Sequence, residues 1–297
     1  MSNSAILSSS IAKKYWMALT GLFLCLFLVG HLLGNLQLIF ITGEEGKRAF
    51  NEYAYFMTHN PFVKVLSYVT YLSILFHAID GFLLTIKNKK ARPVTYAYNN
   101  PGANSSTPSR YMALLGSLIL IFIVTHMANF WWKMKFSSDP MPLHQVVVAN
   151  PQSGAEETFY ITHTGDYVPT SAFVGEGEMP AAMEVRNGTE FYLKEVNLKR
   201  GEGYKDLHSV VLSFFGQDKT KDGVPEKNEM ALFAVLFYVI AMMVLAFHLW
   251  HGFASAFQSL GLNHKAYNKM IKMAGQTFAI IVPALFAIIP ILLFMNK

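Results

Sequence analysis

The stretch Met17–His31 reads MALTGLFLCLFLVGH, and a second stretch, Met112–His126, reads MALLGSLILIFIVTH. Seven positions carry the same residue in both: the pairs are Met17/Met112, Ala18/Ala113, Leu19/Leu114, Gly21/Gly116, Phe27/Phe122, Val29/Val124 and His31/His126. Each stretch is apolar along nearly its whole length and ends in a histidine. With their flanks, both exceed the ~20 residues that cross a bilayer core. We therefore expect two membrane spans of one design, each with a histidine toward one end.

A shorter repeat links two further apolar segments. Phe76–Phe82 reads FHAIDGF, and Phe247–Phe253 reads FHLWHGF, so His77 aligns with His248. Four apolar segments thus carry two kinds of histidine, each kind twice. This pattern is typical of a membrane bundle that holds a ligand between its helices.

Composition supports a membrane protein. The hydrophobic fraction is 53% and the charged fraction 14%, whereas soluble domains carry about 25% charged residues. The single cysteine, Cys25, excludes disulfides, thiolate-held iron–sulfur clusters and covalently attached c-type haem. The net charge of +5 comes without a basic face, so we expect no nucleic-acid partner. The first apolar run, about residues 15–42, is too long for a signal-peptide core and is expected to be a retained span.

The hydropathy pattern predicts an all-α membrane protein in which five transmembrane helices form a bundle. The expected spans are about residues 15–42, 62–86, 110–134, 230–257 and 273–294. Residues 1–135 then hold helices one to three, 136–228 form a long extracytoplasmic insertion, and 229–297 hold helices four and five. Within the insertion, Gln145–Ala149 and Thr158–Val168 are expected to be short strands. An apolar stripe predicts an amphipathic helix that lies on the membrane surface or on the bundle, with the residues Leu207, Val210, Val211, Phe214 and Phe215.

Basic residues predict the orientation. Lys13 and Lys14, the cluster at 87–92 and the lysines of 265–272 all fall on one side of the predicted spans. Because cytoplasmic loops are rich in lysine and arginine, that side is expected to be cytoplasmic. The mixed-charge loop at 43–61 and the insertion then lie outside. The chain is expected to be a multi-pass protein of a bacterial cytoplasmic membrane, in contact with lipid, with its N-terminus in the cytoplasm.

The depths of the four histidines predict how they pair. His31 and His126 lie about sixteen residues from the inner ends of their helices, ~24 Å deep, whereas His77 and His248 lie about ten residues in, ~15 Å deep. An imidazole inside a membrane is costly without a partner. Two depth-matched pairs predict bis-histidine ligation of two b-type haems, an outer one at His31/His126 and an inner one at His77/His248. The alternative is hydrogen bonding of isolated histidines between helices. A single zinc or copper site is disfavoured, because the pairs differ in depth by ~9 Å.

The residues beside the inner pair extend this interpretation. Gly81 and Gly252 each follow their histidine by four residues on the same helical face, where a missing side chain leaves room for a macrocycle. His251 competes with His248 as a ligand, but the repeat aligns His248 with His77 and His251 with Asp80. Asp80 and His251 are then expected to flank the inner haem, where they contact a propionate, carry a proton, or make a polar contact within the bundle.

In their order along all five spans, these segments resemble the five-helix, two-haem cytochrome b subunit of succinate:quinone oxidoreductases, the family of succinate dehydrogenases and quinol:fumarate reductases. The long insertion and Ala18, which replaces an expected inner-end serine, depart from the family pattern. The residues that carry the resemblance are His31-Leu-x-x-Asn35, Ala49-Phe50-Asn51, Phe56-Met57, Pro61-Phe62, Phe76-His77-Ala, the His126 segment and His248-x-x-x-Gly252-Phe-x-Ser255.

The resemblance implies a function in electron transport. Dicarboxylate chemistry would belong to a separate flavoprotein subunit, joined by an iron–sulfur subunit on the cytoplasmic face. Electrons would pass between that subunit and membrane quinone, which the resemblance suggests is menaquinone, through the two b haems. It places the quinone on the side of the outer haem, where the polar candidates are Asn35, Gln37, Glu52 and Asn129.

Two other functions fit the same pattern. One is a di-haem anchor of another membrane oxidoreductase, such as a hydrogenase, formate dehydrogenase or nitrate reductase. The other is a haem-free transporter with an internal repeat and a protonatable pathway through Asp80 and the histidines. The presence or absence of haem colour separates the last from the other two.

Overall fold

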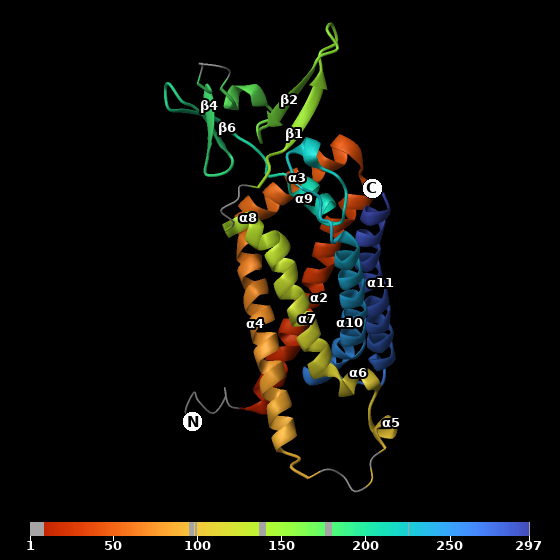
Figure 1. Ribbon diagram of the computed structural model, residues 1–297. Coiled ribbons are helices and arrows are strands. Elements are labelled where there is room, and N and C mark those ends of the chain that lie inside the picture. The colour runs from red at the N-terminus through yellow and green to blue at the C-terminus, as the bar shows by residue number, and fades with distance from the viewer. Residues whose placement is uncertain are drawn as a thin grey trace. The chain divides into compact units, whose positions relative to one another are not determined.

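The structure is a computed structural model that describes residues 9–94, 98, 100–136, 141–175, 180–224 and 226–296 (Figure 1). Five helical segments are long and apolar enough to cross a membrane. The chain is therefore a multi-pass membrane protein in contact with lipid, as its hydropathy predicts. The spans are helix α2 (Ser10–Phe40), helix α4 (Pro61–Lys90), the run Met112–Phe136, helix α10 (Ala231–Ser259) and helix α11 (Asn268–Met295).

The third span is composite. It joins α7 (Met112–Met127), the π-helical turn η1 (Ala128–Trp132) and α8 (Lys133–Phe136). Before it, the loop at 93–109 contains two short helices, α5 (Pro101–Asn104) and α6 (Thr107–Arg110). Residues 95–97 and 99 of that loop lie outside the described part of the chain.

The chain divides into two compact units. Unit 1 comprises residues 1–33, 61–126 and 236–288, and unit 2 comprises residues 34–60, 127–235 and 289–297. Unit 1 thus holds most of the membrane-spanning helices. Unit 2 holds the insertion together with the segments next to it.

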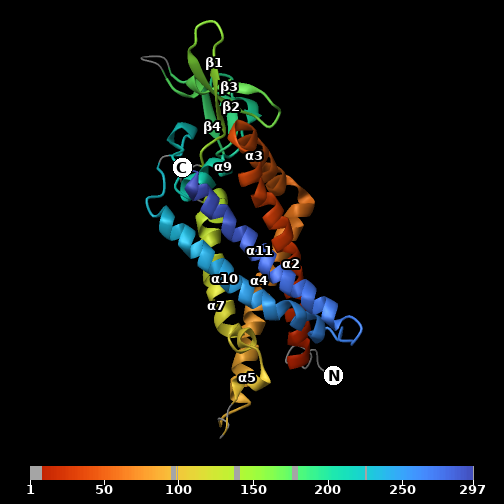
Figure 2. The ribbon, with the colours of Figure 1, turned by 90° about the vertical axis from the view of Figure 1, so that its right-hand side faces the viewer.

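In unit 1, parts of α2, α4, α7, α10 and α11 pack side by side (Figures 1 and 2). Cys25, Leu249 and Ala279 form a small buried core where α2, α10 and α11 meet. Many large apolar side chains point outward instead, among them Leu26, which is 69% exposed. In water this exposure would be costly, so it indicates a lipid-facing surface.

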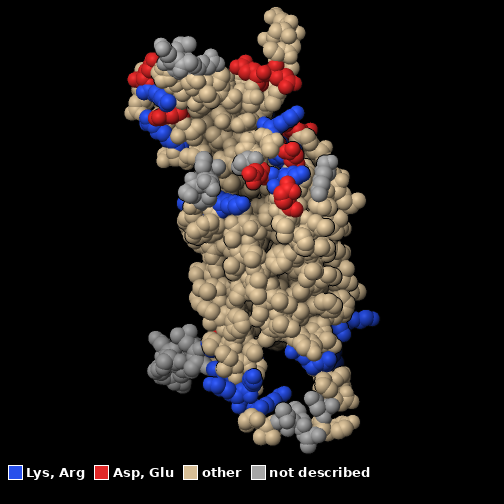
Figure 3. Space-filling model, viewed as in Figure 1, with Lys and Arg blue, Asp and Glu red and all other residues tan. Residues whose placement is uncertain are grey.

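One end of unit 1 is basic. Figure 3 shows lysine and arginine gathered at the end where α4 finishes, next to a wide uncharged band. Lys13, the lysines at 87–90, Arg92, Arg110 and the lysines at 265–272 belong to this end.

Unit 2 is built around helix α3 (Gly43–His59) and two three-stranded antiparallel sheets. The first sheet has the order β1 (Gln145–Ala149), β2 (Glu156–Ile161) and β3 (Tyr167–Pro169), with Val147 opposite Thr158 and Tyr160 opposite Val168. The second has the order β4 (Met183–Arg186), β5 (Glu190–Leu193) and β6 (Leu198–Glu202). The remaining elements are η2 (Thr170–Phe173), α9 (Leu207–Phe214) and η3 (Thr220–Asp222).

The two sheets share a core of Leu143, Met183 and Phe191, against which Tyr160 packs. Phe191 is fully buried, and its ring centroid lies 5.6 Å from that of Tyr160. This contact joins β2 of the first sheet to β5 of the second.

These sheets correct the all-α fold class, which holds only for the membrane-spanning part of the chain. Strand β1 has the expected bounds, but the single strand expected at Thr158–Val168 is two strands, because Gly165, with a φ of +90°, turns the chain between β2 and β3. The second sheet was not expected, since five of the nine residues of β4 and β6 are charged.

Helix α3 replaces the loop expected at 43–61. Its apolar residues Phe50, Tyr53, Ala54 and Met57 follow helical spacing, a signal that the prediction from the mixed charges of the segment overlooked. Its buried face also includes Lys47 and Asn51. The amphipathic helix is present as α9, but it packs on α3, and its buried residues include His208 and Ser209.

Candidate functional site

The inner histidines meet inside unit 1. The ring centroids of His77 on α4 and His248 on α10 lie 6.2 Å apart, with the rings inclined by 68°. His77 Nδ1 lies 3.2 Å from the carbonyl oxygen of Met17 and 3.3 Å from Thr20 Oγ1. Because a carbonyl can only accept, Nδ1 carries the proton, and Nε2 is left with a lone pair for a ligand.

The outer histidines also meet. The ring centroids of His31 on α2 and His126 on α7 lie 5.8 Å apart, nearly perpendicular at 86°. His126 Nδ1 lies 3.2 Å from the hydroxyl of Tyr238 on α10. The hydroxyl thus orients this imidazole from outside the pair, as groups around metal-ligating histidines commonly do.

Both pairs fit a haem iron. Imidazoles that each bond one metal ion at ~2 Å, with ring centres ~1 Å further out, have centroids ~6 Å apart. The observed distances of 5.8 Å and 6.2 Å match that separation. In addition, His248 Nδ1 is buried and has no hydrogen-bond partner among the described residues. This nitrogen is therefore not engaged in a helix–helix hydrogen bond with any described residue.

Glycines of the longer repeat lie against the inner histidines. A Cβ added at Gly21 on α2 would stand 3.1 Å from His77 Cε1, and a Cβ added at Gly116 on α7 would stand 3.7 Å from His248 Cε1. The sequence aligns these two glycines but does not reveal that they lie against the inner histidines. The repeat was the one available signal for them, because it places Gly21 and Gly116 at equal distances before His31 and His126.

Gly81 and Gly252 have less crowded surroundings. A Cβ added at Gly81 meets no atom within 4 Å, and one added at Gly252 meets only Met112 Cε, at 3.8 Å. The structure therefore shows open space beside Gly81. That both glycines adjoin a haem stays a prediction.

Asp80 and His251 differ in their surroundings. The carboxylate of Asp80 forms an ion pair with the ammonium of Lys13 at 3.2 Å, and a carboxylate held in this way already has a partner for its charge. His251 lies one turn after His248 on α10 and is half-buried. The ring that meets His77 is that of His248, the residue favoured by the repeat.

The four polar candidates for the quinone side all belong to unit 2. Asn35 and Gln37 follow His31 along α2, and Asn129 lies in the π-helical turn η1 after His126. Glu52 on α3 is half-buried and accepts a hydrogen bond from Arg48 at 2.7 Å. None of the four lines either of the two unit 2 cavities described below.

Unit 2 contains a buried polar cluster that the sequence did not predict. Lys47 on α3 is 3% exposed and lies 3.2 Å from Asp206 Oδ2 and 2.8 Å from Asp222 Oδ1. Asn51 donates to Asp206 Oδ1 at 2.9 Å and accepts from the backbone N–H of His208 at 3.0 Å. Because the partners lie in the insertion, these contacts tie α3 to it.

Two histidines complete the cluster. His144 and His208 are 1% and 5% exposed, and burial lowers the pKa of each to about 4. Both are therefore neutral at pH 7. His208 Nδ1 is buried and bonded to no residue that the structure describes.

Comparisons with models of known protein families, with curated proteins and with solved structures give no match.

Proposed function

We propose that this chain is the membrane-anchor cytochrome b subunit of a succinate dehydrogenase or fumarate reductase complex. The observation that carries the proposal is the meeting of two histidine pairs inside one helix bundle, at 5.8 Å and 6.2 Å. His31 and His126 would hold one b-type haem, and His77 and His248 the other. Two bound haems supply one-electron carriers at two depths of the bundle. The choice of this complex rests on the family resemblance of the sequence.

The protein's own groups orient the ligands. The Met17 carbonyl keeps the His77 proton on Nδ1, and the Tyr238 hydroxyl holds the His126 ring. Such contacts fix the ring orientation and raise the basicity of the ligating nitrogen.

The basic end of unit 1 supports two further parts of the proposal. It suits a cytoplasmic end with the N-terminus inside, by the positive-inside rule. It would also provide a surface for an acidic iron–sulfur subunit, which carries electrons from a separate flavoprotein subunit. Membrane quinone, proposed to be menaquinone, would be the other redox partner.

A cavity of unit 2 is the proposed site of the quinone headgroup. It has a volume of about 290 Å³ and combines apolar residues such as Leu38 and Leu293 with His208, Gln217 and Lys47. Gln217 Nε2 is bonded to the Leu293 carbonyl at 3.0 Å, whereas His208 Nδ1 is unsatisfied within the described residues. About half of its lining residues are apolar and the rest are polar or charged, Glu44, Lys219 and Asp222 among them, so the cavity offers contacts for both the ring and the carbonyl oxygens of a quinone.

The first test is a dithionite-reduced minus oxidised spectrum of the purified chain, with a pyridine haemochrome count. We expect two haems b per polypeptide. The variant His248→Gln should lose the inner haem, and His251→Gln, one turn away, should keep both. No haem in the native chain would contradict the electron-transport function and favour transport. Loss of a haem in His251→Gln but not in His248→Gln would reassign the ligand.

The second test concerns the partners. Purification of the intact complex should bring down a flavin-containing and an iron–sulfur subunit with succinate:quinone reductase activity. A nickel- or molybdenum-containing subunit would instead identify another di-haem anchor.

The third test concerns the quinone site. In the purified succinate:quinone reductase complex, His208→Leu should raise the KM for a short-chain naphthoquinone with kcat little changed, whereas His264→Leu on an exposed loop should leave this KM unchanged.

A further inference from the structure

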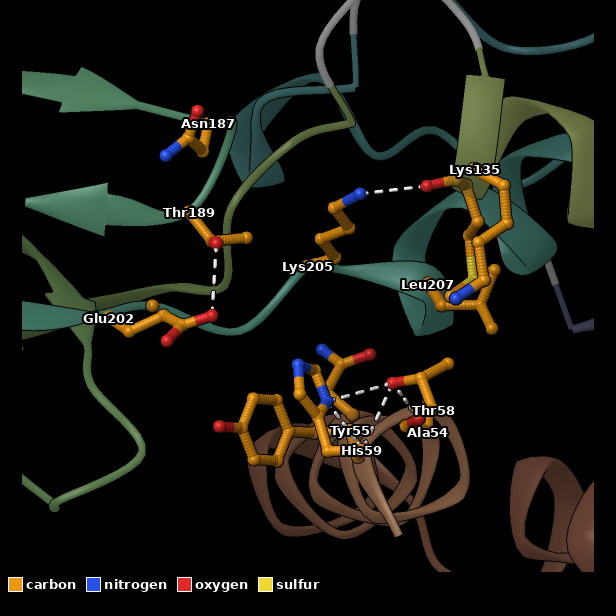
Figure 4. Close-up of a pocket in the computed structure, with 13 residues that line it drawn as sticks. Ala54, Tyr55, Thr58, His59, Lys135, Asn187, Thr189, Glu202, Lys205 and Leu207 are labelled. Atoms are coloured by element: carbon orange, nitrogen blue, oxygen red, sulfur yellow. Dashed lines mark hydrogen bonds between the residues drawn. The ribbon is translucent and has the colours of Figure 1, made fainter. Parts of the chain in front are cut away.

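A second cavity of unit 2 lies between α3, the end of the third span and the second sheet (Figure 4). Its volume is about 220 Å³. Tyr55 and His59 line it from α3, Lys135 from α8, and Glu202 and Lys205 from the region of β6. Most of its lining groups are polar, unlike those of a pocket for an apolar ligand.

Within the described residues, two ammonium groups of the cavity have no acidic partner. Lys205 Nζ donates to the carbonyl oxygen of Met134 at 2.7 Å, and neither Lys205 nor Lys135 forms an ion pair within the described residues. Burial and the nearby charge of Lys135 lower the pKa of Lys205. A bound anion between the two ammonium groups would offset both the desolvation of Lys205 and its repulsion by Lys135.

Glu202, the one carboxylate among the described residues that line the cavity, is directed to other partners. Glu202 accepts from the Thr189 hydroxyl at 3.2 Å, and its other oxygen lies 3.7 Å from Lys199 Nζ. In Figure 4, Lys205 extends away from Glu202 toward the chain at Lys135. Among the described residues, the other titratable groups facing the space are Tyr55 and His59, so no second acid of the described chain opposes the lysines.

The course of the chain places this cavity at the level of the lipid headgroups. His59 ends α3, and the span α4 begins two residues later at Pro61. Lys135 lies in the last turn of the third span, just after Trp131 and Trp132. Tryptophan is enriched where helices leave the hydrocarbon for the headgroup region.

We propose that this cavity binds the phosphate group of an anionic phospholipid from the leaflet on the insertion side, with Lys205 and Lys135 as its cationic contacts. The cavity is smaller than the ~300–1,000 Å³ of sites that enclose a whole drug-sized ligand. A headgroup fits such a volume while its acyl chains remain in the bilayer. A zwitterionic headgroup brings its own cation, which the two ammonium groups repel, so a net negative lipid is preferred. This site does not depend on the proposed haems.

The test is native mass spectrometry of the full chain, delipidated in detergent and titrated with phosphatidylglycerol, phosphatidylcholine or inorganic phosphate. We expect one tightly retained phosphatidylglycerol. Loss of a charge-assisted hydrogen bond in Lys205→Gln should weaken its retention about tenfold or more. Lys205→Arg, which keeps the charge, should retain it. Lys194→Gln, at an exposed lysine between β5 and β6, is the matched control.

Several results would overturn the proposal. One is equal retention of phosphatidylglycerol by Lys205→Gln and Lys194→Gln. Equal binding of phosphatidylcholine would remove the role of net charge, and competition by millimolar inorganic phosphate would indicate a site for the free anion. Thermal melting of each variant distinguishes a lost site from a lost fold, and the Lys205→Arg variant tests the charge in a side chain of similar length.

Discussion

Replacing Gly21 by alanine is expected to displace the His77 ring, whereas the same change at Gly116 leaves His248 in place. The new Cβ at position 21 would stand 3.1 Å from His77 Cε1, and ordinary contacts begin at about 3.4 Å, so the ring must move by about 0.3 Å. At position 116 the distance is 3.7 Å, within the ordinary range. The two glycines are equivalent in the sequence repeat, so they make a matched pair.

The expected free-energy changes of the two variants differ in sign. Overpacking in a close-packed interior costs about 1–3 kcal/mol, which corresponds to a roughly five- to 150-fold loss of affinity at the inner site. Glycine-to-alanine replacement inside a helix otherwise stabilises by about 0.5–1 kcal/mol. Gly116→Ala should therefore be neutral or stabilising, and Gly21→Ala should weaken the inner haem selectively.

The assay is the haem count per chain with a redox titration of the two haems. Gly21→Ala should show fewer than two haems or a shifted potential for one of them, and Gly116→Ala should match the native chain. If Gly21→Ala keeps two haems with native potentials, or if Gly116→Ala is the more damaging change, the inference about packing against His77 is wrong.

Three further predictions concern contacts that only the folded chain brings together. Tyr238→Phe should shift the potential of the outer haem and weaken its retention about 10–100-fold, because it removes the hydroxyl beside His126; redox titration measures this. Lys47→Met should destabilise unit 2 by about 3–5 kcal/mol, because it leaves buried carboxylates uncompensated; thermal melting measures this. Acid should also destabilise unit 2. In the unfolded chain a histidine binds a proton near pH 6.5, whereas buried His144 and His208 bind one only near pH 4. The stability of unit 2 is therefore complete above pH 6.5, and it falls by about 3 kcal/mol per histidine as the pH drops to 4.

Each of these has a control. Lys199→Met removes an exposed lysine of the second sheet and should cost under about 1 kcal/mol, so equal losses from the two lysine variants would contradict the role of burial. Tyr238→Phe should keep two haems at saturating haem, and a native redox titration would show that the hydroxyl is not coupled to His126. For the acid effect, His144→Gln should flatten the melting profile between pH 6.5 and 4. An unchanged profile would mean that His144 does not cause the loss.

The sequence by itself determined the membrane-spanning part of this protein. Hydropathy identifies a helix from its own residues, because each span satisfies its backbone hydrogen bonds internally. A regular rise per residue then predicts the depth of each histidine. That reasoning predicted the pairs His31/His126 and His77/His248, whose rings meet in the structure, although their haem ligation is still to be tested.

Only the tertiary structure decided unit 2 and the differences between repeated residues. Lys47 and Asn51 are buried on α3 because they pair with Asp206 and Asp222. These partners lie more than 150 positions away along the chain. Local periodicity cannot detect such partners, so the segment read as a charged loop. Likewise Gly21 and Gly116 are identical in the repeat, but only the packing of whole helices makes one contact tight and the other loose. The physical reason is that hydropathy acts along one segment, whereas burial of polar groups depends on which distant segments meet.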